Sequence, residues 1–265
     1  MSDRVAERIA DTMSRLLGGD YQEDTIDPGV ADAAQRDRLN HRLAALEMRR
    51  QANIEAVTSM AFAVAGDTTV GDSGGAIDED WLARVVTHAQ EVANPIMQTV
   101  WAEVLARETT TPGNFSLRTL DTLAGVTADD WHTWHRAVQL CFPTGYLLKL
   151  GPRNEFDEFD LTASDIARLQ ALDFLQETDD LSITFYAPSK GLTFDFVGTD
   201  LIVRHPESTL FTLPAYRITG VARELLEHLG GEAANTDYLR ALGESLRPDG
   251  YDFRLRDKET GQLME

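Results

Sequence analysis

The apolar residues of this chain change their spacing once along its length, and that change limits the fold more than any other feature. From the N-terminus to about residue 150 they recur every three or four residues, which is the period of an amphipathic helix. Beyond residue 180 the segments LSITFYA and LTFDFV alternate apolar and polar residues, as strands with one buried face do. The sequence therefore predicts an α+β protein, mainly α, with its helices concentrated in the first half.

The longest predicted helix runs over about residues 28–65. Asp27 and Pro28 open it, and a stripe of apolar residues follows at helical spacing. The stripe consists of Leu39, Leu43, Leu46, Ile54, Val57, Ala61 and Val64. Such a stripe either packs against the helices that follow or forms a coiled-coil seam with another subunit. We favour internal packing in an N-terminal helical bundle, and a homo-oligomer through this helix stays open as the alternative.

A change of composition near residue 150 predicts a domain boundary. Over residues 148–160 the helical period fails and acidic residues accumulate. We therefore divide the chain into a helical domain, residues 1–150, and an α+β domain, residues 151–265. In the second domain Thr162 caps a helix, and Pro188-Ser189-Lys190-Gly191 has the composition of a hairpin turn between the two strands. This order of a helix and a hairpin is that of a winged-helix-like module.

Charge argues against direct nucleic-acid binding. The net charge is −20, so the long-range field repels phosphate backbones and anionic lipids. The prospective recognition helix of the winged-helix-like module carries Asp165, Asp173 and Glu177 against the single Arg168. We therefore expect this module to contact protein or to serve as a scaffold.

The chain has the sequence properties of a cytoplasmic protein. It contains no apolar run of the roughly 18 to 20 residues that span a bilayer, and its first residues lack the apolar core of a secretory signal. The single cysteine, Cys141, excludes an intramolecular disulfide and fits a reducing compartment. We expect Cys141 itself to be buried and inert.

Several charged and polar residues fall on predicted apolar faces. Glu108 lies on the apolar face of the helix near residues 95–110, at the end where the helix dipole disfavours negative charge. Arg118 opens the next helix, where positive charge is disfavoured, and Arg50 and Asn53 interrupt the long stripe. Because an unpaired buried charge is costly, we predict that Glu108 pairs with Arg50, with Arg118, or with both. The predicted structural polar network comprises Arg50, Asn53, Gln98, Trp101, Glu108 and Arg118.

The same region carries a resemblance to a known family. Its motifs are Arg50-Gln51-x-Asn53-Ile54-Glu55, Asp80-Trp81, Gln98-x-x-Trp101, Leu105-Ala106-x-Glu108, Pro112-Gly113-x-Phe115-Ser116-x-Arg118-Thr119-Leu120 and, further on, Ile218-Thr219-x-x-Ala222-x-Glu224-Leu225. Together they resemble the bacterial family catalogued as domain of unknown function twenty-eight-zero-six, over roughly residues 45–130. That family is distantly similar to the abortive-infection alpha proteins, which are associated with phage exclusion. The resemblance implies a defence-associated, non-catalytic role and no catalytic residues.

Other constellations do not predict a metal or cofactor. His132 and His135 are one helical turn apart, a spacing that can hold zinc, but a zinc site needs at least a third protein ligand. Because His135 shares a face with apolar residues, we expect a core histidine. The sequence therefore predicts no metal, no cofactor and no catalytic residue.

Three classes of function follow from these observations. We favour a non-catalytic protein-interaction or regulatory module with a protein partner, in bacterial phage defence as the resemblance implies. The alternatives are an acidic nucleic-acid mimic or DNA-associated regulator, and a hydrolase whose site has no recognisable motif. An enzyme would require Glu108, Arg50 or His135 to face a solvent-filled pocket.

Overall fold

The computed structural model describes residues 3–17, 21, 26, 33–66, 76–151, 156–178 and 181–264. The chain forms two compact units: Met1–Thr69 with Leu82–Ala106, and Val70–Trp81 with Arg107–Glu265. The predicted boundary near residue 150 is not the place where these units divide, and independent folding of residues 1–150 and 151–265 stays a prediction. Among the described residues, no helix combines the length and the apolar character that crossing a bilayer requires.

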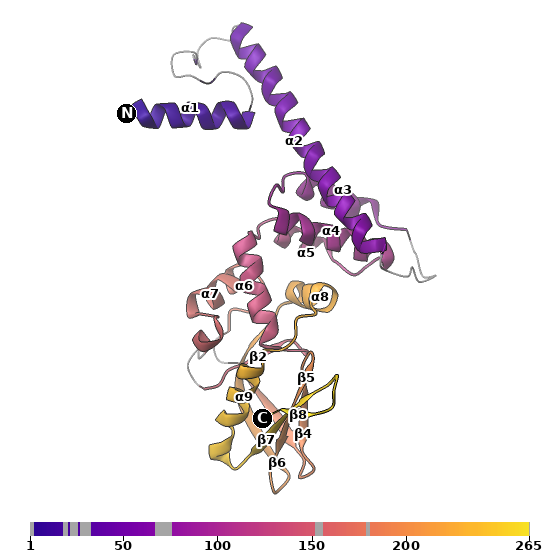
Figure 1. The fold of residues 1–265 in the computed structure, drawn as a ribbon, viewed down its shortest axis with the longest axis vertical. Helices are drawn as coiled ribbons and strands as arrows, with labels where there is room; N and C mark the ends of the chain where they lie inside the picture. The colour runs from indigo at the N-terminus through magenta and orange to yellow at the C-terminus, as the bar shows by residue number, and fades with distance from the viewer. Residues whose placement is uncertain are drawn as a thin grey trace. The chain divides into compact units, whose positions relative to one another are not determined.

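The first unit is built from helices (Figure 1). They are α1 (Asp3–Leu17), α2 (Ala33–Gly66), most of α3 (Glu79–Ala89) and most of α4 (Pro95–Thr110). The predicted α2 start at Asp27-Pro28 lies outside the described residues. At the start of α4 the Asn94 carboxamide oxygen accepts hydrogen bonds from the N–H groups of Ile96 and Met97, which supplies the predicted cap.

The apolar stripe of α2 is buried over one half of the helix and exposed over the other. The buried residues of α2 are Asn53, Val57 and Ala61, all in its second half. In the first half Leu39 is 42% exposed and Leu43 is 51% exposed. The internal packing that we favoured for this stripe is therefore confirmed for its second half alone.

The second unit combines helices with two small sheets. Its complete helices are α5 (Leu117–Leu123), α6 (Ala128–Gln139), α7 (Ala163–Ala171), α8 (Gly220–Leu229) and α9 (Thr236–Ser245), with short 3₁₀ helices at Asp157–Phe159 and Arg247–Asp249. The N-caps predicted at Ser116, Thr127 and Thr162 are confirmed, because each side chain accepts a hydrogen bond from the backbone three residues on. Thr127 and Thr162 form reciprocal capping boxes.

All strand pairs in the two sheets are antiparallel. The strands are β1 (Cys141–Phe142), β2 (Tyr146–Leu148), β3 (Ser182–Ala187), β4 (Leu192–Asp195), β5 (Thr199–Arg204), β6 (Thr209–Arg217), β7 (Asp252–Asp257) and β8 (Leu263–Met264). One sheet has the order β1-β2-β6-β3 and the other β4-β5-β7-β8. The fold is thus α+β and mainly α, as predicted.

The predicted hairpin between β3 and β4 is wrong. The turn itself forms, since the Gly191 N–H donates to the Pro188 carbonyl at 2.8 Å, but β3 pairs with β6 and β4 pairs with β5. The rings of Phe185 on β3 and Phe194 on β4 meet at a centroid distance of 4.9 Å. Each strand therefore buries its alternate aromatic residues between the sheets, and that burial produces the same alternation as a hairpin would.

Candidate functional site

Two amide side chains of the predicted network meet in the first unit. The Asn53 carboxamide on α2 donates to the Gln90 carbonyl at 2.8 Å, and the Gln98 carboxamide on α4 donates to the Val92 carbonyl at 2.9 Å. Gln98 also lies 3.4 Å from the Asn53 carboxamide oxygen, and both side chains are buried. They satisfy the backbone that links α3 to α4, so their role here is to fix the approach of α2 and α4.

Arg50 has acidic partners other than the predicted Glu108. Its Nε atom donates to Glu91 at 2.6 Å and its Nη1 atom donates to Glu47 at 2.8 Å. These hydrogen bonds, that to Glu91 first, raise the pKa of the Arg50 guanidinium. Arg49 also approaches Glu91, at 3.5 Å. The predicted partner is wrong because the residues after α3 bring Glu91 to a guanidinium that stays partly exposed.

Trp101 is fully buried in the same unit. Its indole ring lies 5.8 Å from the His88 ring, measured between centroids. The structure gives the Trp101 indole N–H no acceptor within the described part of the chain. The residue therefore contributes apolar packing rather than the polar link that we predicted.

Glu108 closes the turn that follows α4. Its side chain is 4% exposed, and its two carboxylate oxygens accept hydrogen bonds from the N–H groups of Gly113 at 2.6 Å and Phe115 at 3.0 Å. Gly113 has a φ of +99°, a conformation that favours glycine. The Phe115 carbonyl in turn accepts from the Trp81 indole at 2.8 Å. The buried carboxylate of Glu108 is thus stabilised by hydrogen bonds from backbone N–H groups, which in turn need acceptors.

Arg118, the other predicted partner of Glu108, pairs elsewhere. Its Nη2 and Nε atoms donate to the Asp173 carboxylate at 2.6 and 3.1 Å. Asp173 has a φ of 59°, in the left-handed region, and its carbonyl accepts from the Thr219 hydroxyl. The predicted Glu108–Arg118 pair is therefore wrong.

Two sequence motifs of the family resemblance, one near residues 115–120 and one near residues 218–225, contact each other in the second unit. One Glu224 carboxylate oxygen on α8 accepts hydrogen bonds from the Ser116 N–H at 2.8 Å and from the Thr119 hydroxyl at 2.5 Å. Glu224 thereby satisfies the start of α5, more than a hundred residues earlier in the chain. The residues around 115–120 and 218–225 thus form one cluster.

This cluster borders an open cavity of about 540 Å³. The charged side chains at its wall are Arg118, Asp173, Glu177 and Glu224. Arg118 and Asp173 neutralise each other, so the remaining charge of the wall is negative. Such a wall can receive hydrogen-bond donors or a cationic group. The Ser116 hydroxyl, which also lies at this cavity, caps the N-terminus of α5.

A bidentate ion pair joins α6 to α7. The Arg168 guanidinium donates to the two oxygens of the Asp130 carboxylate at 2.7 and 2.8 Å. Arg168, together with the backbone N–H and hydroxyl of Thr127, holds the pKa of the Asp130 carboxyl well below its ordinary value in spite of burial. Arg168 is the single basic residue of the helix that we considered for nucleic-acid recognition, and it is already engaged.

The histidine pair on α6 is divided between two environments. His132 is exposed, whereas His135 is partly buried with its ring against Trp131 and its Nδ1 atom 3.2 Å from Glu232. No group of three or more histidine, cysteine, aspartate or glutamate side chains is arranged to hold a metal ion within the described residues. Cys141 is buried, as predicted, and burial raises the pKa of its thiol to about 12.

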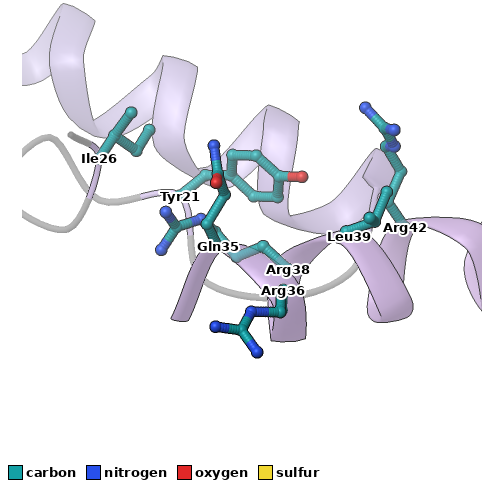
Figure 2. Close-up of a pocket in the computed structure, with 7 residues that line it drawn as sticks. All are labelled: Tyr21, Ile26, Gln35, Arg36, Arg38, Leu39 and Arg42. Carbon is teal, nitrogen blue, oxygen red and sulfur yellow. The ribbon is translucent and has the colours of Figure 1, made fainter. Parts of the chain in front are cut away.

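A second hollow, of about 500 Å³, lies in the first unit. It is lined by Tyr21, Ile26, Gln35, Arg36, Arg38, Leu39 and Arg42. Figure 2 shows that the guanidinium groups of Arg36 and Arg42 point in opposite directions. Arg36 and Arg42 therefore do not converge on one anion.

Apolar side chains on α1 and on the first half of α2 are uncovered. On α1, Ile9 is 50% exposed, Met13 is 36% exposed and Leu16 is 48% exposed. Their spacing of four and three residues places them on one face of α1. Leu39 and Leu43 on α2 are exposed as well, and we refer to these five side chains together as the apolar helical surface of the first unit.

Sequence reasoning did not predict the contacts of three acids that organise these sites, namely Glu91, Asp173 and Glu224. Asp173 and Glu177 are predicted on the recognition helix, but α7 ends at Ala171, so neither lies on it. Glu91 and Asp173 lie outside the regular helices, and nothing in their neighbourhood distinguishes them from solvated acids. Glu224 is different, because the resemblance marked its motif without indicating what it contacts.

Comparison with known proteins identifies one family. Residues 37–150 match the model of the family described as "Protein of unknown function (DUF2806)". The chain is thus an α+β protein in which residues 37–150 are similar to this family, and the resemblance predicted from the motifs is confirmed over those residues. No curated protein and no solved structure matches the chain.

Proposed function

We propose that this protein is a non-catalytic protein-interaction module of a regulatory kind, working in the cytoplasm in bacterial phage defence. The observation that carries the proposal is the uncovered apolar surface of the first unit, formed by side chains of α1 and α2. Single exposed apolar residues are ordinary, but residues that recur on one helical face form a continuous surface whose exposure to water is unfavourable. Docking of a partner removes that surface from water.

The geometry of α1 fits recognition of another protein. Ile9, Met13 and Leu16 follow the spacing of the anchors with which an amphipathic helix enters an apolar groove. Methionine adapts to partner surfaces of different shape because its side chain is unbranched and flexible. The exposed fractions of these side chains leave area for a partner to cover.

A winged-helix-like role for residues 151–265, and a bundle for residues 1–150, belong to the same proposal. In the second part α7 precedes the antiparallel pair of β4 and β5, as the recognition helix of a winged helix precedes its wing. Because Asp130 already engages Arg168, the single basic residue of α7, this helix presents no unpaired cation to a phosphate backbone. That supports protein contact over DNA contact.

The proposal is tested by capture from the native host with a variant of the α1 surface. Ile9→Glu combined with Met13→Glu places charge on the stripe, and Leu210→Glu is the matched control because Leu210 is 65% exposed on β6. We expect the wild type and the control to retain the same partner and the double variant to lose it, with unchanged circular dichroism. Equal capture by all three proteins refutes the proposed function.

A further inference from the structure

We infer that the first half of α2 pairs in parallel with the first half of α2 in a second copy of this chain. The inference rests on the proposed function and names one partner for the helical surface of the first unit. The inference is based on a row of residues at coiled-coil spacing along α2, called the seam here. The rest of this chain covers only part of that seam.

The seam follows the heptad period through α2. Its positions alternate steps of four and three residues: Leu39, Leu43, Leu46, Arg50, Asn53 and Val57. Asn53 and Val57 are buried within the first unit, while Leu39 and Leu43 remain exposed. One continuous face is therefore covered by the chain itself at one end and uncovered at the other.

Charges beside the uncovered seam match those of a second copy. In the heptad that places Leu43 at position a and Leu46 at position d, Arg42 occupies g and Glu47 occupies the following e. In a parallel pair each g residue faces the e residue that lies five positions later in the partner. Arg42 of each copy therefore meets Glu47 of the other, and the contact occurs twice by symmetry.

Neither residue can make this contact within its own helix. Five residues apart, Arg42 and Glu47 point about 140° apart around one helix. Glu47 already receives a hydrogen bond from Arg50, but both side chains are partly or largely exposed, and one carboxylate has room for a second donor. Within the described part of the chain, Arg42 has no carboxylate partner.

The same charges disfavour an antiparallel pair. There, g residues face g residues, so Arg42 would lie near Arg42 or Arg49 of the other copy. Like charges across a contact are destabilising. A parallel arrangement places opposite charges at the contact and is the one the sequence of α2 favours.

Charge reversal tests the pairing on the full-length protein. We expect sedimentation equilibrium to show a monomer–dimer equilibrium for the wild type over about a hundredfold range of concentration. Arg42→Glu and Glu47→Arg each weaken dimerisation by about tenfold, and the double variant restores it. Arg38→Glu is the matched control, because it makes the same change of net charge at an outer heptad position. A double variant no better than the single variants overturns the contact.

Cysteine cross-linking tests the direction of the pair. In a parallel pair position 43 faces position 43, so Leu43→Cys forms an intermolecular disulfide when oxidised glutathione accepts the electrons of the two thiols. Met48→Cys, at an outer and highly exposed position, serves as the control and stays uncross-linked, and the native Cys141 is buried. Dimerisation without cross-linking at position 43 overturns the parallel arrangement.

A wild-type protein that stays monomeric at every concentration overturns the inference as a whole. The proposed function would then still be decided by the capture experiment, which depends on Ile9 and Met13 of α1. The two failures are therefore distinguishable.

Discussion

The prediction with the largest expected effect on stability concerns Glu108. Glu108→Gln keeps the shape of the side chain but replaces one accepting oxygen with an NH₂ donor. Of the Gly113 and Phe115 N–H groups, one keeps an acceptor and the other faces a second donor. The Phe115 N–H is buried, so water cannot easily replace the lost acceptor.

The expected loss of stability follows from the two hydrogen bonds that Glu108 accepts. Leaving one buried backbone N–H unsatisfied costs about 1–3 kcal/mol. The surviving bond loses its charge assistance, which roughly halves its strength and adds about 1 kcal/mol. Because the variant no longer buries a charge, some of this cost is offset, and we expect a net loss of about 2 kcal/mol. Glu108→Ala removes both acceptors and leaves a void, so its cost rises to about 3–5 kcal/mol.

Urea denaturation followed by tryptophan fluorescence measures these differences, since Trp81 donates to the same turn. For a chain of this size, a loss of about 2 kcal/mol lowers Tm by about 4–8 °C. Glu158→Gln is the matched control, because Glu158 is exposed and its replacement leaves the turn untouched. If Glu108→Gln is within about 0.5 kcal/mol of the control, the carboxylate does not hold the turn and the reasoning is wrong.

Three further predictions concern the second unit. Asp130→Asn lowers the free energy of unfolding by about 1.5–3 kcal/mol. Because folding lowers the pKa of this carboxyl, the difference in stability between the variant and the wild type is largest above about pH 4 and shrinks as the pH falls. Urea titrations across that pH range measure this difference. Cys141, whose thiol pKa is about 12, reacts with a thiol reagent at about pH 8 only after unfolding, and equal rates in water and in urea contradict its burial. Gly243→Ala places a Cβ 2.3 Å from the Phe253 ring and lowers stability by about 1–2 kcal/mol after the gain in helix propensity, whereas Gly220→Ala, which meets no atom, is close to neutral in the same assay.

Local chemistry determined the parts of the fold that the sequence predicted well. Ser116, Thr127 and Thr162 cap helices because each hydroxyl satisfies a backbone N–H three residues away. Such interactions involve neighbours in the chain, so their geometry follows once the helix begins. The same holds for the break after α4, where Gly113 adopts a positive φ.

The partners of the charged residues depended on contacts between distant parts of the chain. Arg50 meets Glu91 across 41 residues and Arg118 meets Asp173 across 55, and no spacing rule relates them. Glu108 shows a different error. Its donors at 113 and 115 are local, but they are uncharged amides of the turn, and pairing of opposite charges does not predict them.

Strand pairing failed for a further physical reason. Alternation in β3 and β4 tells which side chains are buried, and it correctly placed Phe185 and Phe194 on buried or half-buried faces. It contains no information about which strand lies beside which, because two packed sheets and one hairpin bury the same alternate residues. The turn at Pro188–Gly191 is compatible with both arrangements.

The stripe of α2 presents the same ambiguity in helical form, and here flanking charge helps to resolve it. An apolar heptad pattern predicts that one face of the helix is buried, but it does not tell whether the same chain or another chain covers that face. At Val57 and Ala61 the chain covers that face itself. At Leu39 and Leu43 it does not, and there Arg42 and the later Glu47 have the spacing of an intermolecular pair. Apolar spacing therefore identifies the seam, exposure shows which part still needs a partner, and the order of charges favours a partner with this same sequence in parallel.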